Sequence, residues 1–87
     1  MKYRIELSRE AASDIDRLQS ADRKLCKRII KKLESLESTP HEGKPLVGNH
    51  KGEFSLRVGD YRIVYALDPP GRSVVILTIK QRKHAYL

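Results

Sequence analysis

The sequence predicts an α+β fold in which a helical hairpin packs on one face of a small, mainly antiparallel sheet. Three observations lead to this prediction: an alternating segment near the N-terminus, two segments with helical spacing after it, and three alternating or β-branched segments in the second half. With 87 residues, the chain can close one small core but not two, so residues 1–87 are expected to form a single domain. The expected order of elements is βααβββ.

The first half contains one strand and two helices. Apolar and charged residues alternate over 3–7, which predicts a strand with one buried face. The side chains expected on that face are Tyr3, Ile5 and Leu7. Ser8 is a typical N-cap for a helix whose apolar residues span 11–18, and Ser20 or Asp22 can start a second helix. Its apolar stripe, over 25–36, ends before Pro40, so a helical hairpin is expected.

The second half begins with a loop and continues with three antiparallel strands. Two prolines and three glycines interrupt both periodicities over 38–52, which predicts a long loop. Residues 54–58 and 61–67 then alternate on either side of Gly59-Asp60, a two-residue hairpin turn with glycine first. After a proline-containing turn, the β-branched residues of 73–80 predict an inner strand.

The hairpin register is expected to bring basic side chains together. A two-residue turn places Arg57 opposite Arg62, on the face that the helices leave bare. Extending the register adds Lys80 to this face, and Arg82 should return toward it. On the covered face, the same register places Val75, Leu77 and Ile79 beside Tyr65, Ile63 and Tyr61. Because opposed like charges destabilise a sheet by up to about 1 kcal/mol, we expect a bound anion to compensate.

Composition narrows the classes of partner and excludes some scaffolds. The chain has 18 Lys+Arg and 11 Asp+Glu, a net charge of +7, which favours nucleic acid or an acidic protein as partner. A single cysteine, Cys26, excludes an internal disulfide, and three scattered histidines do not have zinc-ligand spacing, so neither metal nor cofactor is expected. With no apolar run of transmembrane or signal-peptide type, a cytoplasmic location without membrane association is expected.

Several further polar residues have both a structural and a functional interpretation. His50, Lys51 and His84 could carry a proton or bind phosphate, although a lone His or Lys in a loop usually faces solvent. Tyr86 could stack on a base or act as a general base among cations. The basic face of the second helix is expected to be solvated, and it could also help to hold a ribosome or a protein partner. Its members are Lys24, Lys27, Arg28 and Lys31.

Two segments carry a resemblance to a known family. They are LRVGDYRIVY at 56–65 and KQRKHAY at 80–86, preceded by a K-P-L-x-G-like element at 44–48. Together with the length and the element order, they make the chain resemble the RelE/ParE superfamily of toxins from type II toxin–antitoxin modules. The resemblance implies the RelE-like fold. It also implies a metal-independent endoribonuclease (mRNA interferase) that cleaves mRNA in the ribosomal A site by 2′-hydroxyl attack on the adjacent phosphate.

The resemblance also assigns roles to individual residues. It implies catalytic roles for Arg62, Arg82 and Tyr86. The residues expected to bind RNA phosphates are Arg57, Lys51, Lys80, Lys83 and His84. Bacterial RelE-like members also carry basic residues on the strand before the turn, where this chain has Glu53 and Ser55.

Three functions remain open at this point. The implied partners of a RelE-like nuclease are the ribosome, its mRNA and a RelB-like antitoxin that is acidic and partly disordered. The same scaffold also serves ParE-like proteins, which inhibit DNA gyrase without catalysis. A basic nucleic-acid-binding module without toxicity is the third hypothesis.

Overall fold

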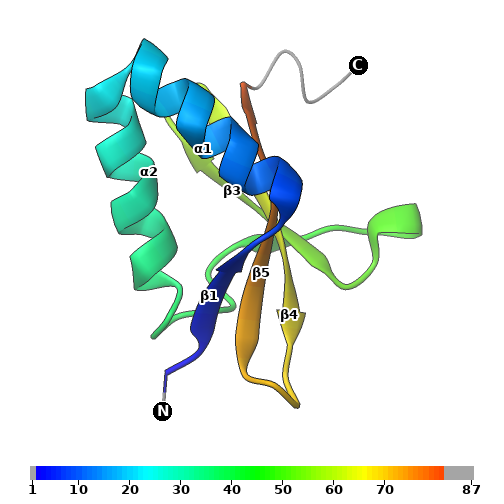
Figure 1. Cartoon of the computed structure of the whole chain (residues 1–87). Helices are drawn as coiled ribbons and strands as arrows, with labels where there is room; N and C mark the ends of the chain where they lie inside the picture. Colours follow the sequence, from blue (N-terminus) through cyan, green and yellow to red (C-terminus); the bar gives the residue numbers. More distant parts are fainter. Residues whose placement is uncertain (1, 82–87) are drawn as a thin grey trace.

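A computed structural model describes residues 2–81 of the chain. Its elements, in chain order, are β1 (Arg4–Leu7), α1 (Arg9–Ala21), α2 (Arg23–Ser35), β2 (Lys44–Pro45), the 3₁₀ helix η1 (Gly48–His50), β3 (Glu53–Val58), β4 (Tyr61–Asp68) and β5 (Ser73–Gln81). The strands form one sheet in the order β1-β5-β4-β3-β2, in which β1 runs parallel to β5 and the other pairs are antiparallel. Both helices cover one face of this sheet, which confirms the predicted fold class (Figure 1).

Side chains cap both helices as the sequence predicts. The Ser8 hydroxyl accepts a hydrogen bond from the Ala11 amide at 3.0 Å and donates one to the Leu77 carbonyl at 2.8 Å. Ser8 therefore starts α1 and also ties its N-terminus to β5. Asp22 caps α2 by accepting from the Leu25 amide at 3.1 Å. Within residues 2–81, neither helix has the length and apolar character needed to cross a membrane.

The core lies between the helices and the covered face of the sheet. Its largest fully buried side chain is Tyr65, whose hydroxyl donates to the Pro40 carbonyl at 2.9 Å and accepts from the Gly43 amide at 2.8 Å. The other buried members are Ala11, Leu18, Cys26, Ile29, Leu33, Leu36, Val58, Ile63, Val74, Ile76 and Ile79. Because the Tyr65 hydroxyl bonds two backbone groups of the loop after α2, the core also fixes the start of that loop.

The predicted hairpin is confirmed, but the predicted register between β4 and β5 is wrong along the whole strand pair. Arg57 lies opposite Arg62 around a turn in which Gly59 has φ +59°, as a glycine-first turn requires. Between β4 and β5 an irregularity at Val64/Tyr65 leaves one extra residue in β5. The predicted partners of Tyr65, Ile63 and Tyr61 were Val75, Leu77 and Ile79, whereas the structure pairs them with Ile76, Ile79 and Gln81. A single extra residue reverses the alternation of faces, which a strictly alternating pattern cannot anticipate.

Two further expectations are corrected. The predicted loop over 38–52 contains β2 and η1, so the element order has one more short strand than βααβββ. Pro45 fits there because β2 is an edge strand, where a missing amide donor is tolerated. Leu7, which was expected to be buried, is 44% exposed, because β1 is the other edge strand and the chain turns into α1 directly after it.

Candidate functional site

A cleft of about 560 Å³ lies on the face of the sheet that the helices leave bare, between the start of α1 and the loop that contains η1. Its lining residues are Glu10, Leu46, Val47, His50, Glu53, Arg62, Val64, Leu77, Thr78 and Lys80. The floor comes from neighbouring strands β3, β4 and β5, and the extra residue in β5 allows Leu77 and Thr78 both to face the cleft. The cleft brings together Arg62 and Lys80, two of the residues that the sequence predicts for the site.

Arg62 is positioned by the strand beside it. Its Nε donates a hydrogen bond to the Ser55 hydroxyl at 2.8 Å, and Ser55 lies on β3 at a position where related toxins were expected to carry a basic residue. Ser55 thus replaces a charge with a hydrogen-bond acceptor that orients the remaining guanidinium. Since a guanidinium stays charged at all physiological pH values and donates in a planar fork, this arrangement suits a phosphate group.

The lining is electrically more balanced than the sequence predicts. It contains two cations, Arg62 and Lys80, and two carboxylates, Glu10 and Glu53. Glu10 lies in the first turn of α1 and Glu53 is the first residue of β3. The predicted register of the β-hairpin did not include either position. Among the described residues, the cleft therefore does not hold the expected cluster in which Arg57, Arg62 and Lys80 converge without acidic neighbours.

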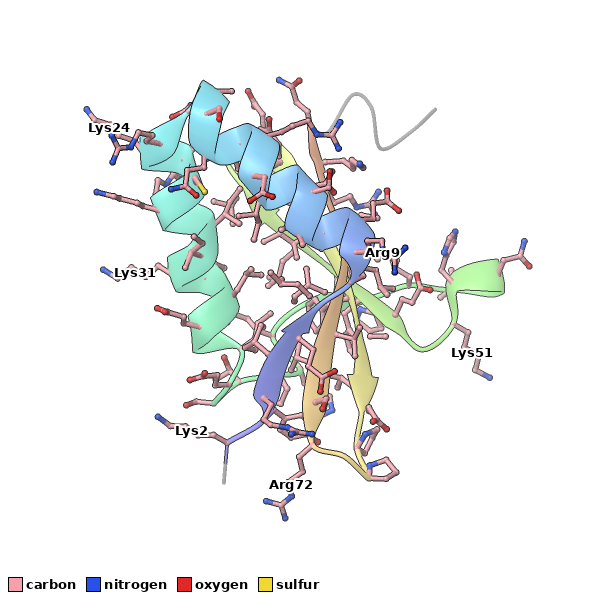
Figure 2. The ribbon with its side chains drawn as sticks, viewed as in Figure 1. Lys2, Arg9, Lys24, Lys31, Lys51 and Arg72 are labelled. Atoms are coloured by element: carbon pink, nitrogen blue, oxygen red, sulfur yellow. The ribbon has the colours of Figure 1, made fainter. Side chains whose placement is uncertain are left out.

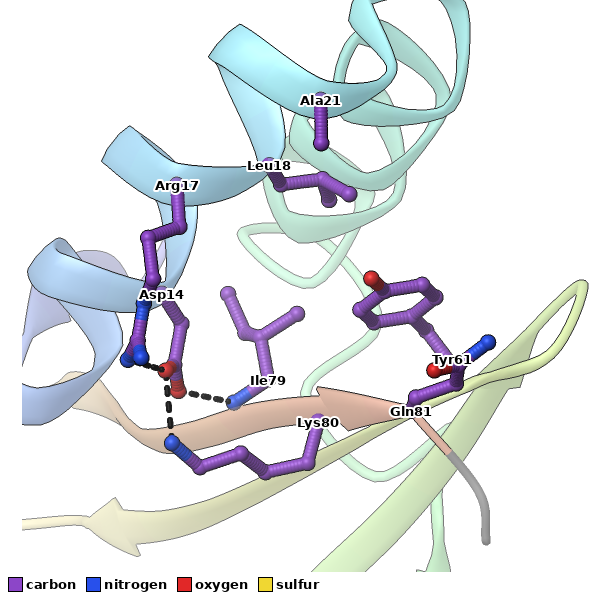
Figure 3. Close-up of a pocket in the computed structure, with 8 residues that line it drawn as sticks. All are labelled: Asp14, Arg17, Leu18, Ala21, Tyr61, Ile79, Lys80 and Gln81. Atoms are coloured by element: carbon purple, nitrogen blue, oxygen red, sulfur yellow. Dashed lines mark hydrogen bonds and ion pairs between the residues drawn. The ribbon is translucent and has the colours of Figure 1, made fainter. Parts of the chain in front are cut away.

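Lys80 is held by acidic residues of α1, and Figure 3 shows its contact with one of them, Asp14. Its ammonium group donates to the Asp14 carboxylate at 2.6 Å and lies 3.2 Å from the Glu10 carboxylate. The hydrogen bond that Lys80 donates to Asp14 raises the pKa of Lys80 above its ordinary value, with Glu10 acting in the same direction against the effect of burial. Lys80 therefore stays protonated at neutral pH and can contribute charge to a bound phosphate but cannot act as a base there.

Asp14 is a buried carboxylate that sequence analysis missed. Its side chain is only 3% exposed, and it also accepts from the Ile79 backbone amide at 3.0 Å and from Arg17 at 2.9 Å. The hydrogen bond from the Ile79 amide joins α1 to the C-terminal part of strand β5, three residues before Arg82 in the sequence (Figure 3). A signal was present in the sequence, because Asp14 follows Ala11 by three residues and so shares the buried stripe of the helix.

Arg57 lines a different hollow from Arg62, although the two residues are directly opposite in register. This second hollow, of about 470 Å³, lies between β3 and α2 and has several cations in its lining. They are Arg28, Lys31, Lys32 and Arg57. Arg57 can reach this hollow because β2 pairs with β3 only at Phe54 and Ser55. Beyond Ser55, β3 is therefore an open edge of the sheet beside α2. Arg57 therefore does not join the cleft, contrary to the predicted convergence.

The remaining predicted residues fall outside the cleft or outside the description. Lys51 is not part of the lining, and Figure 2 shows its side chain extending away from the strands, on the outer side of the loop. Arg82, Lys83, His84 and Tyr86 lie outside the described residues. Their roles stay predictions.

An imidazole and a carboxylate form a pair at the rim of the cleft. His50 Nδ1 lies 3.2 Å from Glu53 Oε1, and both side chains line the same cleft as Arg62. Gly52, with φ +95°, reverses the chain between the two residues and so allows η1 to fold back on β3. Among residues 2–81, no three His, Cys, Asp or Glu side chains gather as a set of metal ligands.

Comparison with known proteins places this chain in one family. A family model described as "ParE toxin of type II toxin-antitoxin system, parDE" matches residues 5–86. The chain is 35% identical over 85 residues to toxin RelE of Mycobacterium tuberculosis, covering 97% of this chain and 86% of that protein. We conclude that the chain belongs to the RelE/ParE family of toxins from type II toxin–antitoxin systems.

Solved structures agree with this assignment. The toxin–antitoxin complex RelBE2 from M. tuberculosis contains a chain with 28% identity and a TM-score of 0.84, and the match covers 94% of this chain and all of that one. The YoeB dimer from Staphylococcus aureus gives 28% identity and a TM-score of 0.74, over 92% of this chain and 97% of that one. The predicted family and the RelE-like fold are thus confirmed.

Proposed function

We propose that this toxin is a ribosome-dependent, metal-independent endoribonuclease that cleaves mRNA in the A site. The observation that carries the proposal is the cleft on the helix-free face, where Arg62 is oriented by Ser55 beside Lys80. The name of the M. tuberculosis relative, toxin RelE, supports the RelE-like activity over the gyrase inhibition of ParE-like proteins. In the proposed reaction, the 2′-hydroxyl attacks the adjacent phosphate, which yields a cyclic phosphate and a free 5′-hydroxyl end.

The described residues supply charge and shape for this reaction. Arg62 would stabilise the extra negative charge on the phosphorane, an effect worth about 3–4 kcal/mol for a well-placed donor. Lys80 would contribute its charge from the same floor, reduced by its carboxylate partners. Leu46 and Val47 form an apolar part of the wall, and Val47 is 84% exposed, so a nucleobase can pack against it. We assign Arg82 to the same phosphate and Tyr86 to stacking on a base.

The basic hollow beside α2 suits the RNA backbone of the ribosome. Arg57 is exposed there, and the lining of the hollow contains four cations and no carboxylate. Lys32 pairs with Glu42, which lies outside the lining. We propose that this surface increases affinity for the ribosome through phosphate contacts, while Lys51, Lys83 and His84 contact the mRNA. Binding through such contacts weakens steeply with salt.

We also propose an acidic antitoxin of the RelB type as partner. The net charge of +7 favours an acidic chain, and the similar M. tuberculosis toxin was solved in a toxin–antitoxin complex. A partly disordered antitoxin can wrap a basic surface and fold as it binds. Since the proposed substrate is mRNA on a translating ribosome, the toxin would act in the cytoplasm.

The test uses the purified chain and ribosomes programmed with a defined mRNA, with new 5′ ends mapped by primer extension. We expect cuts within the A-site codon, and we expect Arg62→Ala to reduce the rate about 10²–10³-fold because one charge-stabilising donor is lost. Lys2→Ala is the matched control, since Lys2 is an exposed cation far from the cleft (Figure 2). Inhibition of gyrase supercoiling without RNA cleavage would contradict the proposal and favour the ParE-like activity. Salt-sensitive RNA binding with neither effect would favour a simple binding module.

A further inference from the structure

The pair formed by His50 and Glu53 has the geometry of an oriented base. The two side chains are three residues apart in the chain and meet because η1 folds back on the start of β3. The His50 side chain is 67% exposed, whereas that of Glu53 is 29% exposed. The imidazole is thus open to solvent, while the carboxylate that holds it is mostly covered. Both lie in the lining that contains Arg62.

The hydrogen bond determines which ring nitrogen is available. An ionised carboxylate only accepts hydrogen bonds, so the contact between Nδ1 and Oε1 requires the proton to sit on Nδ1. In the neutral ring, the lone pair is then on Nε2, the nitrogen that Glu53 does not contact. An imidazole in this tautomer presents Nε2 as the acceptor of a proton, while Nδ1 stays hydrogen-bonded to the carboxylate.

We propose that His50 is the general base of the reaction and that Glu53 is its positioning residue. This inference rests on the proposed ribonuclease activity. His50 Nε2 takes the proton of the 2′-hydroxyl as the 2′-oxygen forms a bond to phosphorus. The bond from phosphorus to the 5′-oxygen breaks, and that oxygen takes a proton from water, which leaves hydroxide. The imidazolium then returns its proton to this hydroxide, so the enzyme is regenerated beside a 2′,3′-cyclic phosphate and a 5′-hydroxyl.

The other groups that line the cleft leave this role to His50. Lys80 from β5 remains protonated because Asp14 and Glu10 hold its ammonium group. Arg62 from β4 is permanently charged. Glu10 from α1 is engaged with Lys80. These charges and that of Glu53 line the same cleft as the imidazole, so the pH dependence of cleavage includes their influence.

The proposal explains the unusual residues on β3. Related toxins were expected to carry basic residues where this chain has Glu53 and Ser55. Here Glu53 holds an imidazole and Ser55 holds a guanidinium, at 3.2 Å and 2.8 Å. The two positions therefore act by orienting their neighbours rather than by supplying positive charge of their own.

The experiment measures single-turnover cleavage on programmed ribosomes between pH 5.5 and 9. We expect His50→Ala to lower the rate about 10²-fold or more at neutral pH, to remove the rise of rate with pH on the acidic side, and to recover in part when imidazole is added. Glu53→Gln should lower the rate less, because the ring keeps its nitrogen but loses its anchor. Ribosome affinity should not change in either variant. His41→Ala is the matched control, since His41 is exposed and outside the cleft lining.

Each outcome decides the question. If His50→Ala cleaves like the unaltered protein, or loses rate without a change in pH profile and without rescue by imidazole, His50 is not the base and this inference is overturned while the ribonuclease proposal stands. If the unaltered protein cleaves no RNA on the ribosome, both proposals are overturned together. Thermal unfolding of each variant identifies any loss that comes from misfolding, and His50→Gln then serves as the second variant with a side chain that cannot take the proton.

Discussion

Replacing Asp14 by asparagine tests whether this buried carboxylate joins the helical layer to the end of β5. The carboxylate accepts three hydrogen bonds: Oδ2 from the Ile79 amide at 3.0 Å, and Oδ1 from Lys80 at 2.6 Å and from Arg17 at 2.9 Å. Asparagine has the same shape but only one acceptor oxygen and no charge. If that oxygen keeps the hydrogen bond from the Ile79 amide, the NH2 group of the asparagine faces the Lys80 ammonium group. Both of these groups are hydrogen-bond donors, so the contact becomes unfavourable.

The magnitude follows from the partners that are lost. A hydrogen bond to a charged group contributes about 1.5–3 kcal/mol, which applies to the partly covered Lys80. The contact with Arg17 adds less than about 1 kcal/mol, because the Arg17 side chain is 70% exposed and screened by water. We therefore expect Asp14→Asn to lower the free energy of unfolding by about 2–3 kcal/mol. For a domain of this size, that corresponds to a decrease in Tm of about 10–20 °C.

Urea and thermal unfolding followed by circular dichroism measure this loss. Asp16→Asn is the matched control: it makes the same substitution two residues farther along α1, where the side chain is exposed, and should change stability by less than about 0.5 kcal/mol. In a Lys80→Met background, Asp14→Asn should destabilise less than in the unaltered protein, because the main charged partner is already absent. If Asp14→Asn and Asp16→Asn have the same effect, the network does not anchor β5 as argued.

Three further predictions concern other contacts. Gly43→Ala should destabilise by about 1–3 kcal/mol in urea unfolding, because a Cβ at Gly43 would lie 2.6 Å from the Tyr65 hydroxyl; an unchanged midpoint would contradict this. Burial raises the pKa of Tyr65, so its contribution to stability is fully present below pH 10 and is lost as pH rises through the raised value. Unfolding at pH 9 and pH 11 should show a larger loss for the unaltered protein than for Tyr65→Phe, and equal losses would refute the assignment. Ser8→Ala should lower the free energy of unfolding by about 1 kcal/mol or more, since both the cap of α1 and the bond to Leu77 disappear, and a thermal midpoint within 1–2 °C of the original would contradict it.

The fold could be predicted because its main determinants are local. Ser8 and Asp22 cap the helices at the positions where the apolar periodicity begins, and Gly59 selects a two-residue turn that fixes the β3–β4 register by itself. Such signals depend on residues within a few positions of one another, so a single sequence contains them. The bulge near Tyr65 depends instead on how two strands pack under the helices, and alternation alone gives no sign of it.

The candidate site was harder to predict because its parts come from elements that meet only in three dimensions. Register placed Arg62 and Lys80 on the correct face, but the carboxylates that balance Lys80 come from α1, 66 residues away in the chain for Asp14. Register also does not describe how far a side chain at a sheet edge can turn, so Arg57 faces α2 rather than the cleft. The chemistry of the site changes accordingly. The floor of the cleft is not an anion-binding site formed by cations without acidic partners. The cleft contains one guanidinium oriented by Ser55, one compensated ammonium and, at its rim, an imidazole held by Glu53, and this set can separate charge stabilisation from proton transfer.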